Sequence, residues 1–339
     1  MRTIAWSDDN GGAITLIDQT LLPGKETALQ ITHHNQLIDA IKRLAVRGAP
    51  ALGVAGALGV ALIIKEAEAG VVSPGEVSIA IENLRNSRPT AVNLAWGVDQ
   101  VLPFVPAGFA SVLEHALELS RRDGEANRAM GRNGADFLIS LTGANTQKKM
   151  RILTHCNTGA LATTDWGTAL GVVRELHNRN LVEEVYADET RPLLQGSRLT
   201  AWELHKLKIN YRILPDGAAA SALFSGLIDA VLIGADRIAR NGDTANKIGS
   251  LAVALAASQA GIPFLVVAPE STIDREIASG SEIEIEFRDD REVTTLAGVS
   301  IAPEGSKAYN PAFDVTPHRY ITAIVTEKKV YQPSQGDEL

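Results

Sequence analysis

The chain has 339 residues, of which 45% are hydrophobic and 21% charged, so it can bury a large core and is not broadly disordered. Its formal net charge is −8, and it has no run of lysine or arginine, which argues against nucleic acid as its partner. Cys156 is the only cysteine, which excludes an internal disulfide and the zinc sites built from several cysteines. A reducing cytosol fits this composition, and the N-terminal residues lack the apolar core of a signal peptide.

The first part of the chain predicts a β-hairpin followed by helices. Strand-like residues 4–6 and 13–17 flank an Asn-Gly turn, which is typical of a hairpin. Helical patterns follow over about residues 36–45 and 74–86. A long polar helix over residues 109–141 is expected to link two domains.

A further helix is expected to begin after Arg47, Gly48 and Ala49, because the proline that follows suits a first helical turn. The longest apolar run of the chain, Ala49–Ile64, lies in this helix. It is short for a bilayer span and rich in glycine, so we expect a buried helix and no membrane contact. Its glycines at three-residue spacing share one face and predict close packing against another backbone.

From Arg151 onward, strand-length apolar runs alternate with helical stretches, which is typical of a parallel sheet covered by helices on both faces. We therefore expect an α/β protein with two domains. Residues 1–125 form a smaller N-terminal domain of hairpin and helices, and residues 126–339 form a doubly wound, Rossmann-like α/β domain. The expected strands of its sheet cover residues 151–156, 183–189, 209–216, 229–236 and 263–269.

Polar or small residues end each of these runs, and ligands of open α/β sheets bind at the carboxyl ends of the strands. No glycine-rich dinucleotide fingerprint and no Walker-type phosphate loop is present, which disfavours a dinucleotide or ATP site. The histidines are scattered without metal-site spacing, so no metal is expected.

Two of the expected strand ends carry side chains that could take part in a reaction. Cys156 precedes an expected helix beginning at residues 158–160, whose dipole would favour the thiolate; the alternative is a buried, inert cysteine. Asp236 ends an apolar strand, where partial burial would favour a protonated carboxyl that can act as a general acid. The alternative for Asp236 is a helix N-cap in contact with Arg237. The residues by themselves leave both alternatives open.

Three cations at expected helix starts, Arg47, Arg88 and Lys247, together suggest a phosphate pocket in an acidic protein. For a lone lysine or arginine, a solvated surface position is the simpler interpretation. Gln195 lies in a long polar loop after the second strand and is a candidate for binding sugar hydroxyls, although a tight turn explains the loop equally well.

Seven stretches spread over nearly the whole chain resemble one family. The chain resembles the methylthioribose-1-phosphate isomerases, within a larger family that includes ribose-1,5-bisphosphate isomerases and the regulatory subunits of the exchange factor for eukaryotic initiation factor 2. The matching stretches are RGAPALGVAGALG, SRPTAVNLAWG, ILTHCNTGALAT, VYADETRPLLQGSRLTAWEL, DAVLIGADRIARNGDTANKIGSLAVA, STID and NPAFDVTPHRYITAIVTEK.

This resemblance implies an aldose–ketose isomerase that converts 5-methylthioribose-1-phosphate to 5-methylthioribulose-1-phosphate in methionine salvage. It implies that Cys156 and Asp236 are the catalytic pair. It also implies a cytoplasmic homodimer without metal or nucleotide cofactor. The implied substrate-binding residues belong to the RGA, SRPT, LLQG and ANK segments and are Arg47, Gly48, Ala49, Arg88, Gln195, Asn246 and Lys247.

Two alternatives remain open on the sequence. One is an isomerase of 5-deoxyribose-1-phosphate or ribose-1,5-bisphosphate; a 5-phosphate would require more cations than the sequence places in the pocket. The other is a non-catalytic regulatory subunit of the same family. A thiol–carboxyl pair weighs against this second alternative, because a binding module has no need of one.

Overall fold

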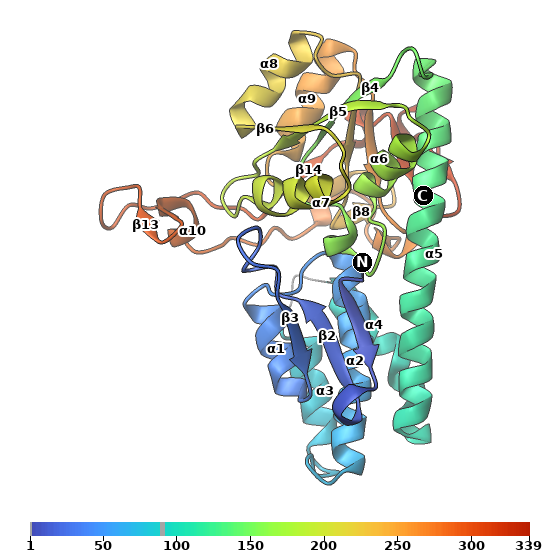
Figure 1. The fold of residues 1–339 in the computed structure, drawn as a ribbon, viewed down its shortest axis with the longest axis vertical. Coiled ribbons are helices and arrows are strands. Elements are labelled where there is room, and N and C mark those ends of the chain that lie inside the picture. Colours follow the sequence, from blue (N-terminus) through green and yellow to red (C-terminus); the bar gives the residue numbers. More distant parts are fainter. Residues whose placement is uncertain (1, 89–91) are drawn as a thin grey trace. The chain divides into compact units, whose positions relative to one another are not determined.

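The computed structural model describes residues 2–88 and 92–339. The chain forms two compact units. The first unit consists of Met1–Arg128 and Thr158–Gly167, and the second consists of Ala129–Asn157 and Thr168–Leu339. Helix α5 (Phe109–Thr142) begins in the first unit and ends in the second, as its predicted linking role requires (Figure 1).

The first unit contains the predicted hairpin and helices. Strands β1 (Ile4–Ser7) and β2 (Ala13–Ile17) pair antiparallel, which confirms the hairpin, and β3 (Ala28–Ile31), which was not predicted, adds a third strand. The helices of this unit are α1 (His34–Lys42), α2 (Ala49–Glu68), α3 (Val77–Arg85) and α4 (Val92–Val101).

Helix α2 is the core helix of the first unit. It is long and apolar enough to cross a membrane, but 83% of its most apolar window is buried inside the protein, as in the core helix of a globular unit. Close packing of its glycine face is confirmed, because a Cβ on Gly97 of α4 would lie 1.9 Å from the carbonyl oxygen of Gly53. Only glycine allows the two backbones to approach this closely.

A seven-stranded sheet forms the centre of the second unit, in the order β16-β15-β10-β7-β4-β5-β6. All five predicted strands are present and mutually parallel. Strand β15 extends the parallel set and β16 pairs antiparallel at one edge; neither was predicted. The strands are β4 (Met150–Thr154), β5 (Val182–Asp188), β6 (Tyr211–Leu214), β7 (Ala230–Ile233), β10 (Phe264–Val267), β15 (Ala323–Val325) and β16 (Val330–Tyr331).

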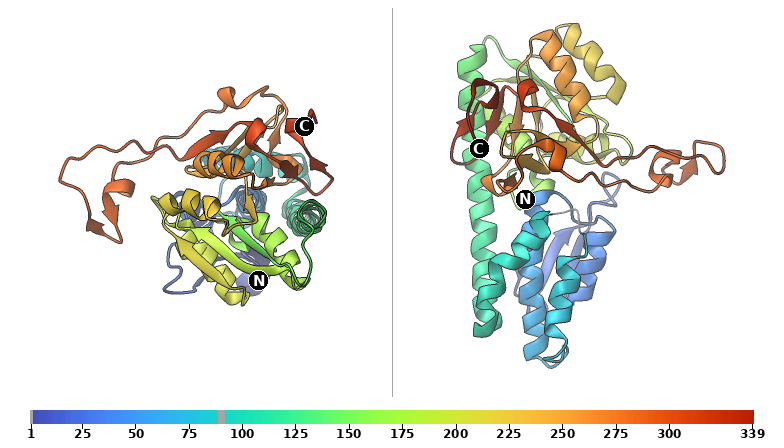
Figure 2. Two further views of the ribbon diagram at one scale, coloured as in Figure 1. Left: turned by 90° about the horizontal axis from the view of Figure 1, so that it is seen from above. Right: turned by 180° about the vertical axis from the view of Figure 1, so that it is seen from behind.

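Helices cover both faces of this sheet (Figure 2). Ile152 on one face packs in a cluster with residues of α5, α6 (Ala169–Asn178) and α7 (Ala201–Lys206). Its neighbour Leu153 points to the other face and packs with residues of α8 (Ala219–Phe224) and α9 (Ser250–Ala260). This alternation confirms the predicted doubly wound α/β fold.

The strand order is that of the Rossmann fold, because the chain runs from β4 outward through β5 and β6 and then returns to β7 on the other side of β4. The order therefore reverses between β4 and β7. Ligands of doubly wound sheets bind in the crevice beyond the carboxyl ends of the strands at this switch point. The candidate functional site is accordingly sought after β4 and β7.

A second, four-stranded sheet in this unit has the order β11-β8-β9-β14 and was not predicted. Its strands β8 and β9 lie between β7 and α9 in the chain, where Lys247 was expected to start a helix, and its strands β11 and β14 follow β10. Its strands are β8 (Arg237–Ala239), β9 (Thr244–Lys247), β11 (Ile273–Asp274) and β14 (Phe313–Thr316).

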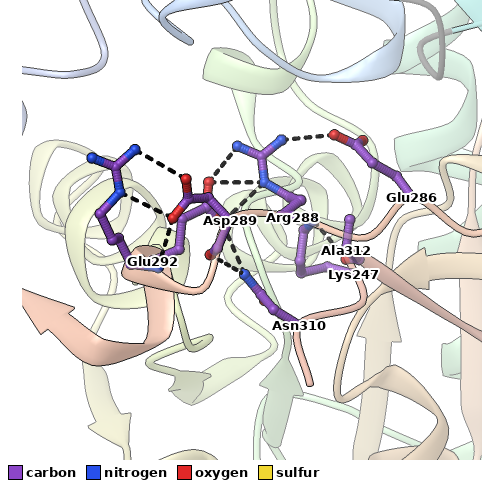
Figure 3. A network of polar contacts seen from close by, with 8 residues as sticks. Lys247, Glu286, Arg288, Asp289, Glu292, Asn310 and Ala312 are labelled. Atoms are coloured by element: carbon purple, nitrogen blue, oxygen red, sulfur yellow. Dashed lines mark hydrogen bonds and ion pairs between the residues drawn. The ribbon is translucent and has the colours of Figure 1, made fainter. Parts of the chain in front are cut away.

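An extended arm, defined here as residues 284–310, projects from the second unit in both views of Figure 2. It carries α10 (Arg291–Thr294) and the short hairpin of β12 (Thr295–Leu296) and β13 (Val299–Ser300). The base of the arm is held by Arg288, whose guanidinium donates to Glu286 and Glu292 (Figure 3).

Candidate active site

Cys156 lies directly beyond β4, in a backbone conformation that its neighbours impose. Its φ angle is 64°, which is uncommon for a residue with a Cβ and persists only where the surroundings enforce it. The amide of Cys156 donates to Thr190 Oγ1 at 2.9 Å, and its carbonyl accepts from Thr200 Oγ1 at 2.6 Å. The thiol-bearing residue is thus held by two threonines from the segment after β5.

The predicted helix beginning at residues 158–160 is wrong. Ala160–Ala162 form a single 3₁₀ turn, and the next α-helix begins only at Ala169. A helix dipole therefore gives no support to a Cys156 thiolate, because its influence is confined to the first turn of a helix. The sequence misled here because Thr158, Gly159 and Ala160 suit a helix start locally, whereas the segment Thr158–Gly167 belongs to the first unit.

His155, next to Cys156, is buried and engaged through both ring nitrogens. Nδ1 lies 2.9 Å from Asp188 Oδ2, at the end of β5, and Nε2 donates to the carbonyl of Ile248 at 2.8 Å. Burial raises the pKa of Asp188, and the hydrogen bond from His155 offsets this only in part. Burial alone would lower the pKa of His155, but the hydrogen bond and charge of Asp188 outweigh it and the pKa is raised.

The ligating atoms of His155, Asp188 and Asp216 lie within 4.8 Å of one another, which makes them a possible metal-binding group. The hydrogen bonds around them account for the cluster without an ion. Both nitrogens of His155 are engaged, and the carboxylate of Asp216 accepts from the amides of Thr190 at 2.7 Å and Arg191 at 2.6 Å. Asp216 thereby anchors the loop after β5 to the end of β6.

Asp236 lies beyond β7, between that strand and β8, and is half-buried. The alternative interpretation of Asp236 as a helix N-cap is wrong. A strand follows Asp236, and the guanidinium of Arg237 donates to Asp274 at 3.0 Å. The amide of Asp236 donates to the carbonyl of Ala245 at 2.9 Å, which places Asp236 beside the Asn246 segment.

Lys247 ends β9 and does not start a helix, contrary to the prediction. The reason is the pairing of β9 with β14 in the small sheet, which makes Asn246 and Lys247 strand residues. The Lys247 ammonium donates to the carbonyl of Ala312 at 2.7 Å and lies 4.3 Å from the ring centroid of Phe313 (Figure 3). The neighbouring Asn246 donates to Ser250 Oγ at 2.8 Å, at the start of α9.

Gln195 is fully buried and precedes a π turn, Gly196–Thr200. This turn packs against the end of β5, since a Cβ on Gly196 would lie 1.6 Å from the carbonyl oxygen of Asp188. In the same loop, the guanidinium of Arg191 donates to the carbonyls of Pro192 and Val293.

The remaining predicted residues belong to the first unit. Gly48 is the N-cap of α2 and Ala49 its first residue, so the predicted helix start is confirmed. Gly48 has a φ of 94°, and a Cβ there would lie 2.3 Å from the carbonyl oxygen of Ala162, in the same unit. Arg47 and Arg88 are half-buried, and Pro89 and Thr90 lie outside the described residues.

Within the second unit, the fold thus brings together predicted residues that are far apart in the sequence. Thr154 of β4 pairs with Leu232 of β7, so Cys156 and Asp236 both follow the carboxyl ends of neighbouring parallel strands. The hydrogen bonds of Cys156 with Thr190 and Thr200 place the segment that contains Gln195 beside Cys156 as well. Sequence reasoning missed the His155–Asp188 pair; the only signal was that each residue ends a predicted strand.

A family model described as the initiation factor 2 subunit family matches residues 45–333. The chain belongs to this family. Its membership confirms the resemblance found in the sequence motifs, and the family's solved members share its fold.

Two relatives and two solved structures are particularly informative. A methylthioribose-1-phosphate isomerase of Gloeobacter violaceus is 47% identical over 99% of this chain and 94% of its own length. The 5-methylthioribose 1-phosphate isomerase of Pyrococcus horikoshii has a TM-score of 0.88 at 40% identity, with coverage of 98% of this chain and 92% of its own. A structure titled translation initiation factor eIF-2B, subunit delta, from A. fulgidus has a TM-score of 0.85 at 41% identity, with coverage of 98% and 96%. A 5-deoxyribose 1-phosphate isomerase of Moorella thermoacetica is 45% identical over 97% of this chain and 94% of its own length.

A probable bifunctional methylthioribose-1-phosphate isomerase/methylthioribulose-1-phosphate dehydratase of Nocardia farcinica is 50% identical over 97% of this chain. This chain spans only 58% of the length of that relative.

Proposed function

We propose that this protein is an aldose–ketose isomerase that converts 5-methylthioribose-1-phosphate to 5-methylthioribulose-1-phosphate in methionine salvage. The observation that carries the proposal is that Cys156 and Asp236 both lie at the switch point of a Rossmann-like sheet, beyond the paired strands β4 and β7. Relatives named for this reaction are 44–47% identical to the chain over nearly their full length, which supports the same assignment.

The substrate determines what the site has to do. A phosphate on the anomeric oxygen of the pentose blocks the free aldehyde, so the ring has to open with the phosphate in place. Asp236, in its protonated form, donates a proton to the ring oxygen as the bond from C1 to that oxygen breaks. Its position after a buried strand limits solvent access and thereby strengthens such a proton transfer.

Cys156 then removes the proton from C2, which gives an enol phosphate. Protonation at C1 and loss of the hydroxyl proton at C2 complete the ketose, so that atoms and charge balance. A hydride shift from C2 to C1 is the competing route, in which both residues would polarise the substrate without taking its C2 proton. The steps require no metal or nucleotide cofactor.

The residues proposed to bind the substrate are those that the resemblance to the isomerases implies. Arg47, Arg88 and Lys247 are the cations proposed to hold the phosphate, with the amides of Gly48 and Ala49 at the start of α2. Gln195 and Asn246 are proposed to bind the sugar. The ammonium of Lys247 would exchange its bond to the Ala312 carbonyl for the phosphate.

Direct turnover in deuterated water tests the function. We expect rapid formation of ketose from 5-methylthioribose-1-phosphate and deuterium at C1, because a proton removed by Cys156 exchanges with solvent. Retention of the substrate hydrogen at C1 would instead indicate the hydride shift.

The same assay run with 5-deoxyribose-1-phosphate and ribose-1,5-bisphosphate separates the alternatives. The deoxy sugar is the stronger alternative, because a relative 45% identical to this chain is named for it. Conversion of the deoxy sugar alone would support the proposed isomerase reaction but assign it a different substrate. Folded protein that converts none of the three would refute the isomerase and favour a regulatory subunit.

The proposal also includes a cytoplasmic homodimer without membrane or nucleic-acid partners. The net charge of −8 disfavours nucleic acid, whose phosphates would be repelled. The arm supports self-association, since a short hairpin is only marginally stable alone and this one exposes apolar side chains. These side chains are Phe287, Leu296, Val299, Ile301 and Tyr309.

Sedimentation equilibrium should give twice the chain mass of 36.1 kDa. Replacing Phe287 and Tyr309 together by serine should shift the protein toward monomer, because the two rings pack edge to face at 5.5 Å and form the apolar base of the arm. Val71→Ser, at an exposed apolar position of the first unit, is the matched control. A wild-type protein that sediments as a monomer would contradict the homodimer.

A further inference from the structure

One imidazole connects three segments of the candidate site. His155 precedes Cys156, its Nε2 donates to Ile248, which follows Lys247, and its Nδ1 faces Asp188 at the end of β5. The side chains of His155 and Asp188 are each only 1% exposed. The ring also packs on the backbone of Gly249, where a Cβ would lie 2.7 Å from the ring. Any movement of the ring is therefore transmitted to the residues on either side.

The hydrogen-bond partners determine how many protons this pair holds. A carbonyl oxygen only accepts, so Nε2 must carry a proton to donate to Ile248. Nδ1 and Asp188 Oδ2, 2.9 Å apart, then need one further proton between them. Asp188 Oδ1 has no hydrogen-bond partner among the residues that the structure describes, so a full negative charge on this carboxylate would be poorly solvated. The buried pair accordingly retains a shared proton.

The acidic groups around the ring favour retention of the shared proton. Asp216, beyond β6, faces the imidazole, and Glu189 faces the Asp188 carboxyl. Asp314 of β14, which accepts from the amides of Gly249 and Leu251, also interacts with the imidazole. These acids favour retention of the proton. Lys247 acts on Asp314, whose pKa is raised by burial and lowered in part by this positive charge.

We propose that the His155–Asp188 pair is a positioning device, which holds the segments of Cys156 and Lys247 in their relative places through one shared proton. The inference rests on the proposed function, since those segments carry its assigned residues. Loss of the shared proton would leave a lone pair of Nδ1 facing a lone pair of Oδ2. The contact would become repulsive, and the three segments would separate.

The stability of the fold and the turnover should both depend on the protonation of this pair. A proton that the folded state holds more tightly than the unfolded chain stabilises the fold at lower pH, and this contribution disappears as the pH rises through the folded-state pKa. Turnover should therefore fall on the alkaline side as the pair loses its proton.

Asp188→Asn is the decisive variant. Its amide donates to Nδ1 at every pH, so the contact persists without a proton to lose. We expect kcat at neutral pH to remain within a few-fold of the wild type and the alkaline limb of its pH profile to move to higher pH. Asp188→Ala, which deletes the contact, should lower kcat about 10²-fold at all pH values, as misplacement of a catalytic group by about 1 Å does.

Glu66→Gln is the matched control, since Glu66 is a buried carboxylate paired with His33 and His34 in the first unit. Its alkaline limb should coincide with that of the wild type. An alkaline limb at the same pH in Asp188→Asn and the wild type would overturn the inference. A folded Asp188→Ala protein with wild-type kcat would also overturn it.

Alkylation of Cys156, the only cysteine, by iodoacetamide separates this inference from the proposed function. In the wild type, loosening of the segment should accelerate alkylation at alkaline pH beyond the increase due to thiol ionisation, and Asp188→Asn should abolish this additional increase. If no sugar phosphate reacts but the alkylation profiles differ in this way, the isomerase proposal is wrong and the positioning inference stands. Normal turnover with identical alkylation profiles would support the isomerase proposal and refute the positioning inference.

Discussion

Cys156→Ser and Asp236→Asn should each lower kcat by about 10²- to 10⁴-fold, because each removes a group assigned to a proton transfer. Serine at position 156 is a far weaker base than a thiolate, and asparagine at position 236 has no proton to give to the ring oxygen. Steady-state kinetics with 5-methylthioribose-1-phosphate measures the loss.

Both variants should fold normally. The bonds that hold Cys156 in its φ of 64° involve its amide and carbonyl, which the substitution leaves unchanged. Asp236 is likewise held through its amide, which donates to Ala245. Circular dichroism and urea unfolding should therefore match the wild type.

Asp229 offers a matched control for Asp236, since it precedes β7 whereas Asp236 follows it. Its carboxylate accepts from the amide and the guanidinium of Arg151 at 2.8–3.0 Å, at the end of the sheet opposite to the proposed site. Asp229→Asn should lower the free energy of unfolding and leave kcat nearly unchanged. Near-wild-type kcat in both Cys156→Ser and Asp236→Asn would refute the assigned roles.

Gly196→Ala should strongly lower the free energy of unfolding of the second unit. The new methyl carbon would lie 1.6 Å from the Asp188 carbonyl oxygen and 3.0 Å from Thr190 Oγ1. The carbonyl oxygen is backbone at the end of β5, so it cannot move aside as a flexible side chain would. Overpacking of this kind typically costs about 1–3 kcal/mol, and a contact with backbone at this distance belongs at or above the upper end.

The clash also predicts a loss of function in the protein that still folds. The π turn of Gly196 would have to move away from β5, together with Gln195 before it and Thr200, which binds the Cys156 carbonyl. Urea unfolding and kcat measured on the same preparation would detect both effects. Gly217→Ala is the control, because a Cβ there meets no atom within 4 Å. Equal stability of the two alanine variants would show that the close contact is not tightly packed.

The sequence by itself determined the elements whose signal is local. The hairpin of β1 and β2, the glycine-faced helix α2 and the five main parallel strands were all predicted, since each depends on apolar periodicity and turn residues within a short window. The motifs around Cys156 and Asp236 also indicated the family, which the comparisons confirm.

Only the tertiary structure decided how these elements combine. The reversal of strand order between β4 and β7 depends on non-local pairing, which no short window contains. The same holds for Lys247, because the pairing of β9 with β14 replaced the expected helix start. The ammonium of Lys247 binds the carbonyl of Ala312, which is 65 residues away in the sequence. His155 meets Asp188 and Ile248 across separations of 33 and 93 residues. The His155–Asp188 contact forms because the carboxyl ends of the parallel strands β4 and β5 meet at one edge of the sheet, whereas the Lys247–Ala312 contact depends on the antiparallel pairing of β9 with β14. Both are consequences of topology and not of local propensity.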